Sequence, residues 1–259
     1  MGAIALPDPL PAKAEFLLRM GDATLVLGHR ISEWCGHAPA LEEDVALANV
    51  ALDLIGQTQL WLGYAAEETG AADADALAFR RDVWDFRNPL LVERPNGDFA
   101  HTILRSFLFD AWHLPRLDRL TGSADDRVAG IAAKAAKEVA YHLERSRGLV
   151  VALGDGTAES HDRMQAALDR LWPYAGELFE TDATDAAMAE AGVADEPPAL
   201  RPAWEATVLP ALAAATLAPP EVVRFQAGGR TGRRHTEHLG PMLAQMQWLQ
   251  RSYPDASAW

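Results

Sequence analysis

Apolar residues recur every three or four positions over long stretches of the chain, and the alternating pattern of strands is almost absent. The second stretch begins after Pro39 with the acidic turn Glu42-Glu43-Asp44, which suits the positive end of a helix dipole. Such stretches are much longer than the usual helix of about 11–12 residues. Prolines and glycines separate them. The pattern predicts four long helices, at about Ala12–Trp34, Ala40–Glu68, Asp98–Leu120 and Ser123–Leu153.

The links between these helices are short, apart from one loop expected from Gly70 to about Gly97. Four long helices with one longer crossover describe a ferritin-like bundle. Shorter helices are expected to follow, at about His161–Phe179, Asp182–Glu190, Pro202–Thr216 and His235–Ser252. The sequence therefore predicts an all-α fold, a ferritin-like four-helix bundle with additional C-terminal helices, in a single domain over residues 1–259.

Composition narrows the possible partners and the compartment. A formal charge of -14 opposes nucleic-acid binding, which needs Lys and Arg to neutralise phosphates. No apolar run approaches the roughly 20 residues that span a bilayer. One cysteine, Cys35, leaves no internal disulfide and fits a reducing compartment. We therefore expect a cytoplasmic protein that binds neither nucleic acid nor membrane.

Acids and histidines on the long helices can be compared with a di-iron ligand set. Ferritin-like di-iron proteins carry a Glu on each of two helices and a Glu-x-x-His pair on the other two. The i, i+3 spacing puts both side chains of a pair on one helix face. The candidates at matching depth are Asp53, Asp110, His113, Glu138 and His142, and Asp110 with His113 keeps the required spacing.

This candidate set is incomplete. Gly56 and Tyr141 stand where the other two pairs would need a His, and the first helix presents residues 24–27, with no acid, at the expected depth. The favoured interpretation is a metal-free core whose acids pair with bases such as Lys134 and Lys137. The alternative is a catalytic di-iron oxygenase that uses the same five side chains as an unorthodox ligand set.

A glycine-rich basic loop, residues 228–234, has a composition that suits phosphate, with backbone N–H groups and arginine side chains. It lacks the Gly-Lys-Ser/Thr ending of a P-loop. An exposed loop that faces a partner is favoured over a ligand-binding loop.

Several long motifs of this chain resemble one family. They are residues 30–39 (RISEWCGHAP) with 47–57 (LANVALDLIGQ), residues 92–99 (VERPNGDF) with 110–113 (DAWH), and residues 235–244 (HTEHLGPMLA). Together they resemble the PaaC family of subunits of the bacterial ring 1,2-phenylacetyl-CoA epoxidase. The likeness extends over nearly the whole chain.

The resemblance implies a ferritin-like fold and a place in a multicomponent monooxygenase of aerobic phenylacetate catabolism. In that system a PaaA-type subunit holds the di-iron centre and epoxidises the ring of phenylacetyl-CoA, and a reductase subunit supplies electrons. A PaaC-type subunit supports the catalytic subunit and has lost the metal ligands. The expectation is therefore a non-catalytic structural subunit of a hetero-oligomer, with no cofactor in this chain.

The resemblance also implies contacts with coenzyme A at a loop between the second and third helices and at a later helix. By position these fall on Asp85, Phe86, Arg87 and Asn88, and on Ala186, Ala187 and Met188. Asp85 and Arg87 depart from the family pattern. The arginine suits a phosphate, and the neighbouring acid weakens that contact. Packing of this loop against the partner subunit is an equal alternative.

Overall fold

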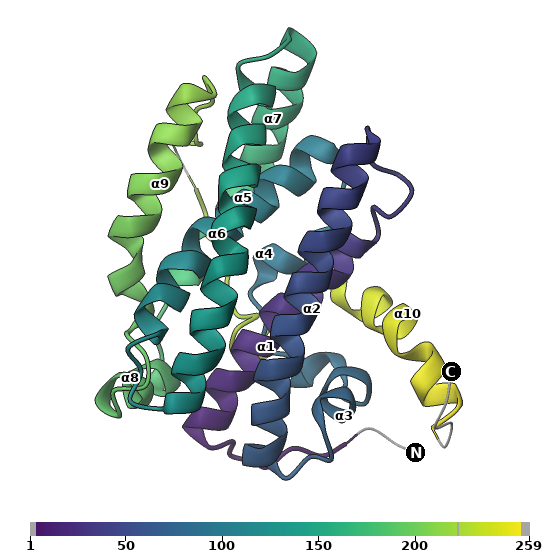
Figure 1. Ribbon diagram of the computed structural model, residues 1–259, viewed down its shortest axis with the longest axis vertical. Coiled ribbons are helices and arrows are strands. Elements are labelled where there is room, and N and C mark those ends of the chain that lie inside the picture. The colour runs from purple at the N-terminus through teal and green to yellow at the C-terminus, as the bar shows by residue number, and fades with distance from the viewer. Residues whose placement is uncertain (1–3, 222, 255–259) are drawn as a thin grey trace.

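Four long helices dominate the computed structural model, which describes residues 4–221 and 223–254 (Figure 1). No strand occurs in these ranges. The predicted all-α fold is therefore confirmed, and each long helix lies close to its predicted range. The four are α1 (Ala12–Ser32), α2 (Leu41–Thr69), α5 (Phe99–Leu120) and α6 (Asp126–Gly154).

The bundle is built from two tightly packed pairs, α1 with α2 and α5 with α6. α1 lies at the centre, because nearly every residue from Ala14 to Ile31 is buried. Gly21 permits the close approach of α2, since a Cβ there would lie 2.5 Å from the Cδ2 atom of Leu62. The apolar core extends from α1 through both pairs.

The crossover between α2 and α5 was predicted as a loop, and this is partly wrong. It contains the short helices α3 (Ala74–Phe79), η1 (Val83–Asp85) and α4 (Leu90–Glu93). Asp73 caps α3 through a hydrogen bond from the backbone N–H of Ala76, at 2.7 Å. Helices this short do not show a periodic pattern, and burial of residues such as Leu77 against the bundle stabilises them.

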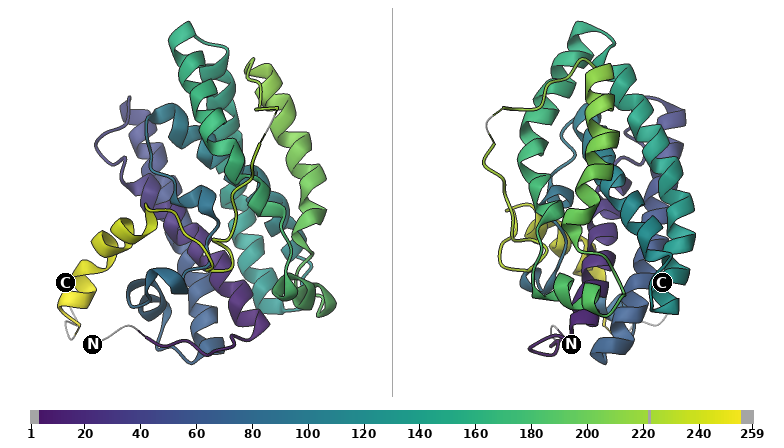
Figure 2. Two further views of the ribbon diagram at one scale, coloured as in Figure 1. Left: turned by 180° about the vertical axis from the view of Figure 1, so that it is seen from behind. Right: turned by 90° about the vertical axis from the view of Figure 1, so that its left-hand side faces the viewer.

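The C-terminal part covers one side of the bundle, and α10 projects from it beside α3 (Figures 1 and 2). One predicted helix, at 161–179, ends early because Pro173 interrupts it and two 3₁₀ turns follow. Another begins late because Glu93 accepts the backbone N–H of Thr236 and holds that segment outside the helix. The elements are α7 (Ala158–Leu171), η2 (Trp172–Tyr174), η3 (Gly176–Phe179), α8 (Ala183–Glu190), η4 (Pro197–Leu200), α9 (Arg201–Ala214) and α10 (Leu239–Ser252).

In the part of the chain that the structure describes, no helix is both long and apolar enough to cross a bilayer. A single domain over 1–259 stays a prediction. Its first three and last five residues lie outside the described ranges.

Candidate functional site

Polar side chains join α2 to α6 at the depth where the metal candidates were predicted. The Nε2 atom of His142 lies 3.0 Å from Oδ2 of Asp53. One turn away, the side-chain amide of Gln57 donates to Oε2 of Glu138 at 3.1 Å. Hydrogen bonds between side chains therefore connect these two helices.

The other two candidates lie on α5 and take part in the same polar layer. The ring Nε2 of His113 lies 3.2 Å from Oε1 of Gln57, so Gln57 connects His113 with Glu138. The hydroxyl of Ser146 donates to Oδ2 of Asp110 at 3.1 Å. Gln57 and Ser146 therefore belong to the polar layer. The sequence analysis missed them because it considered only acids and histidines.

Burial sets the protonation of the two α5 side chains. It raises the pKa of Asp110 to about 6, with His142, Ser146 and Arg145 acting against it. Burial lowers the pKa of His113 to about 3, and its electrostatic interactions with Arg116 and His142 lower it further. At neutral pH, His113 is therefore a neutral imidazole, and Asp110 is largely ionised.

These residues do not fit a di-iron centre. The Nδ1 atoms of His113 and His142 are buried and have no hydrogen-bond partner among the described atoms. A bound metal ion would provide such a partner. However, no group of three or more His, Cys, Asp or Glu side chains in the described ranges is placed to hold a metal ion. That this chain binds no iron stays a prediction.

Two details of the predicted core are wrong. Asp53 was expected to be buried, but its side chain is 38% exposed at the edge of the layer. Lys134 does pair with Glu138, with its Nζ 3.6 Å from Oε1, but it was expected within the core and its side chain is 60% exposed. The i+3 position after Glu138 also faces solvent, since Tyr141 is 53% exposed and His142, at i+4, is buried.

The first helix does carry a buried acid at mid-depth, contrary to the sequence interpretation. Asp22 is fully buried on α1 and accepts a hydrogen bond from Nη1 of Arg81 at 2.9 Å. Its Oδ2 also accepts the backbone N–H of Arg87 at 2.8 Å. Asp22 therefore anchors the loop at residues 85–88 and does not join the polar layer. Its place among apolar neighbours of a buried helix was the missed signal.

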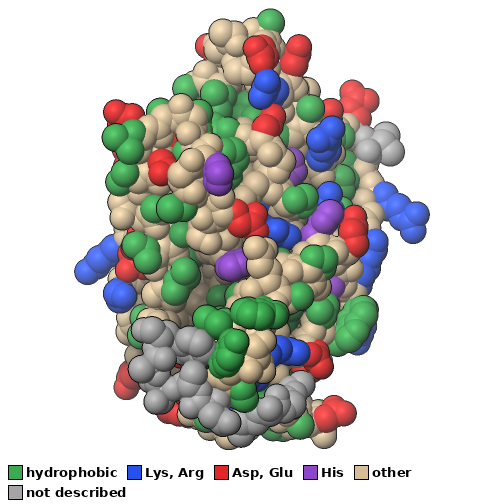
Figure 3. Space-filling view, turned by 90° about the vertical axis from the view of Figure 1, so that its right-hand side faces the viewer, with side chains coloured by type: hydrophobic (Ala, Val, Ile, Leu, Met, Phe, Trp, Pro, Cys, Tyr) green, Lys and Arg blue, Asp and Glu red, His purple; other side chains and the backbone are tan. Residues whose placement is uncertain are grey.

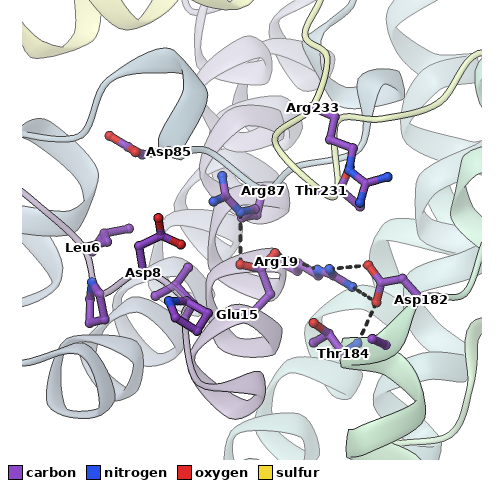
Figure 4. A pocket seen from close by; sticks show the side chains of 14 residues that line it. Leu6, Asp8, Glu15, Arg19, Asp85, Arg87, Asp182, Thr184, Thr231 and Arg233 are labelled. Carbon is purple, nitrogen blue, oxygen red and sulfur yellow. Dashed lines mark hydrogen bonds and ion pairs between the residues drawn. The ribbon is translucent and has the colours of Figure 1, made fainter.

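A pocket of about 590 Å³ lies beside that loop (Figure 4). Five segments that are distant in sequence meet there: the N-terminal segment, α1, the loop, the start of α8 and the basic loop 228–234. Its lining includes Leu6, Asp8, Glu15, Arg19, Asp85, Arg87, Asp182, Thr184, Thr231 and Arg233. Such a concave site with converging polar groups is where a small molecule would bind.

The residues predicted to contact coenzyme A are placed differently from one another. Asp85 and Arg87 line the pocket. Phe86 and Asn88 are fully buried, and the amide of Asn88 donates to Oε1 of Glu93 at 2.9 Å. On α8 the lining residues are Ala183 and Thr184. Among the other predicted contacts, Ala186 is exposed, Ala187 is half-buried and Met188 is buried, and none of them lines this pocket. The predicted contacts stay predictions.

Carboxylates neutralise two of the three arginines in the pocket. The Nε atom of Arg87 lies 3.0 Å from Glu15, and Nη2 of Arg19 lies 2.6 Å from Asp182. Burial alone would raise the pKa of Asp182, but the Arg19 guanidinium lowers it to about 2. Arg233 is exposed and has no ion pair with a described residue. An anionic group in this pocket would therefore meet Arg233 first.

The backbone of the basic loop is already hydrogen-bonded. The buried carboxylate of Glu177 accepts the N–H groups of Gly228 and Arg230, each at 3.0 Å, and that of Leu90 at 2.7 Å. Burial raises the pKa of Glu177 even though these three donors favour its charged form. The loop thus offers the pocket side chains, those of Thr231 and Arg233, but not the amides of Gly228 and Arg230 that its composition suggested.

Comparison with known proteins agrees with this architecture. The family profile described as "Phenylacetic acid catabolic protein" matches residues 7–259. The chain is 52% identical over 239 residues to the C subunit of the 1,2-phenylacetyl-CoA epoxidase of Escherichia coli (strain K12), and this match covers 92% of the chain and 96% of that protein. The resemblance seen in the sequence motifs is confirmed, and the chain belongs to the phenylacetic acid catabolic protein family, whose fold is all-α and ferritin-like.

Proposed function

We propose that this chain is a non-catalytic structural subunit of a phenylacetyl-CoA epoxidase complex. One observation carries the proposal. At the depth where a di-iron protein gathers its ligands, Asp53, Glu138 and His142 are hydrogen-bonded between α2 and α6. The 52% identity to a protein named as a subunit of such an epoxidase supports it. The iron and the oxygen chemistry then belong to a second, PaaA-type subunit, which a reductase subunit supplies with electrons.

The polar layer gives this subunit the cohesion that metal ligation gives a di-iron bundle. Each of its hydrogen bonds contributes on the order of 0.5–1.5 kcal/mol, and those to charged groups contribute more. These bonds hold α2 against α6, which otherwise pack less closely than the members of each pair. The chain therefore remains a firm bundle on which a partner can dock.

The outer face of α2 is suited to contact a second helical subunit. Leu41, Val45, Leu52 and Ile55 are exposed there. At 3.6 residues per turn they fall within an arc of roughly 80° on one helix face. Figure 3 shows hydrophobic side chains on the side of the molecule that carries α2 and α10. An apolar stripe of this kind is typical of helix–helix interfaces between subunits.

The 590 Å³ pocket is the place where this subunit would border the acyl-CoA substrate. Its exposed Arg233 and the hydroxyls of Thr184 and Thr231 suit the phosphates of coenzyme A. Glu15 holds the guanidinium of Arg87 at the rim and Asp22 holds its backbone N–H, so Arg233 is the arginine of this pocket left for the phosphates.

The function is tested by comparing the chain alone with the chain co-expressed with its di-iron partner. We expect the isolated chain to contain no stoichiometric iron and to show no oxygenase activity, and the co-purified complex to epoxidise phenylacetyl-CoA. Metal analysis that finds two irons per isolated chain would overturn the proposal.

Coenzyme A binding is tested separately, by calorimetry on the complex. Arg233→Ala should weaken binding by about tenfold, the effect of losing one charge-assisted hydrogen bond. Arg147→Ala, which removes an exposed arginine on α6, is the matched control and should have no effect. Equal affinities of the two variants would show that this pocket does not contact the substrate.

A further inference from the structure

A second pocket, of about 440 Å³, lies between the start of α5 and α7. The turn that precedes α5 and two successive turns of α7 form its walls. It shares no lining residue with the 590 Å³ pocket. The side chains that matter for its chemistry are His101, Arg163, Arg170, Asp98 and Asp162.

Three arginines that form no ion pair with a described residue, Arg94, Arg105 and Arg170, lie close enough to His101 of this pocket to act on its charge. Arg105 is fully buried, and its guanidinium donates to the carbonyl of Arg94 and to Oδ1 of Asn96, neither of which carries a charge. Arg94 stacks its guanidinium on Tyr174, with 4.9 Å to the ring centroid. Arg170 lines the pocket, and among the described residues none of these three arginines has a carboxylate within ion-pair distance. In a chain of net charge -14 this local excess is unusual.

His101 supplies an independent sign of a ligand. Its side chain lines the pocket and is 7% exposed, and its buried Nδ1 has no hydrogen-bond partner among the described atoms. Burial, together with Arg105, Arg94 and Arg170, lowers the pKa of His101 to about 4. A buried ring nitrogen without a hydrogen-bond partner is costly, and a ligand oxygen that accepted a hydrogen bond from the neutral ring would offset that cost.

The two acids that line the pocket do not form an ion pair with Arg170. Asp98 caps α5, since its Oδ1 accepts the backbone N–H of His101 at 2.9 Å. Its other oxygen lies 3.9 Å from Arg163, which is also held by Glu159 at 2.6 Å. Asp162 is exposed, as are Arg163 and Arg170, so water screens the charges of all three, and Asp162 forms no ion pair with a described residue. Arg170 and the ring of His101 therefore remain available to a ligand.

We propose that this pocket binds a small oxyanion, a phosphate or carboxylate group on a compact molecule, between Arg170 and His101. Arg170 offers charge-assisted hydrogen bonds, and His101 offers a neutral ring nitrogen. The positive end of the α5 dipole adds to the attraction. This inference does not depend on the proposed epoxidase function, because the residues involved belong to neither the polar layer nor the 590 Å³ pocket.

The test uses the full-length chain with inorganic phosphate and acetate as probes. Calorimetry should detect at least one of the two with a dissociation constant below about 1 mM in a low-salt buffer. The ring ¹⁵N resonances of His101, assigned by their absence in His101→Gln, should shift on titration at pH 7. Arg170→Ala should weaken binding by at least about tenfold, and Arg170→Lys should restore part of it.

The matched control is Arg147→Ala, which removes an exposed arginine that does not line the pocket and should bind like the wild type. Phosphate binding alone assigns the pocket to phosphoryl groups, and binding of both probes assigns it to oxyanions in general. Either result supports the proposal. No heat with either probe, or equal binding by Arg170→Ala and Arg147→Ala, would overturn it.

Discussion

Glu138→Ala separates a structural from a catalytic role for the polar layer. In the folded chain, Glu138 accepts one hydrogen bond from Gln57 and lies 3.6 Å from the exposed Lys134. If Glu138 were an iron ligand, its removal would abolish turnover. In a structural subunit the same change should reduce stability and leave the activity of the assembled complex unchanged.

The size of the stability loss follows from these contacts. Gln57 is 1% exposed, so losing its acceptor leaves a buried amide unsatisfied, at a cost of about 1–3 kcal/mol. The pair with Lys134 adds about 0–1 kcal/mol, because that lysine is in solvent. Because Ala has a better helix propensity than Glu, the substitution also adds back a few tenths of a kcal/mol of stability. We therefore expect a loss of about 1–3 kcal/mol, below the roughly 3–5 kcal/mol expected for stranding a buried charge.

Glu138→Gln is the matched control, because its amide oxygen still accepts the hydrogen bond from Gln57. Urea unfolding followed by circular dichroism measures the free energy of unfolding of all three proteins, and epoxidation by the co-purified complex measures function. Glu138→Gln should retain most of the stability and full activity. An assembled complex that loses its turnover with Glu138→Gln would refute the structural role.

Three further outcomes are expected. Asp110→Asn should stabilise the chain by about 1–3 kcal/mol above pH 7, since the pKa of Asp110 rises from 3.8 to about 6 on folding. Its ionisation therefore opposes folding as the pH rises. Unfolding curves from pH 5 to 8 should show that the extra stability of Asp110→Asn decreases as the pH is lowered. Gly21→Ala should lose about 1–3 kcal/mol by thermal denaturation, because its Cβ meets Leu62, whereas Gly63→Ala, with open space around its Cβ, should gain about 0.5–1 kcal/mol. Leu52→Glu should leave the chain folded but reduce the amount of partner subunit that co-purifies with it. If the same amount co-purifies, the exposed face of α2 is not part of the interface.

The long helices could be predicted because each carries a stretch of apolar periodicity much longer than noise would produce. The short crossover helices could not, because their stability comes from contacts across the chain. The role of Gln57 could not be predicted for the same reason. It is one of several polar residues on α2, and its hydrogen bond with His113 on α5 results from the packing of these helices.

The sequence by itself determined the helical bundle, the five polar residues that lie at one depth on three of its long helices, and the family. Periodicity and motifs depend on residues that are close together in the sequence, so they can be recognised without the tertiary structure. Only the tertiary structure decided that Asp53 lies at an edge, that Lys134 stays in solvent and that Asp22 holds the crossover loop. It also brought Arg94, Arg105 and Arg170 close to His101, which lines one pocket with Arg170. Direction and burial of a side chain depend on which elements pack against its helix, and that information is distributed over the whole chain.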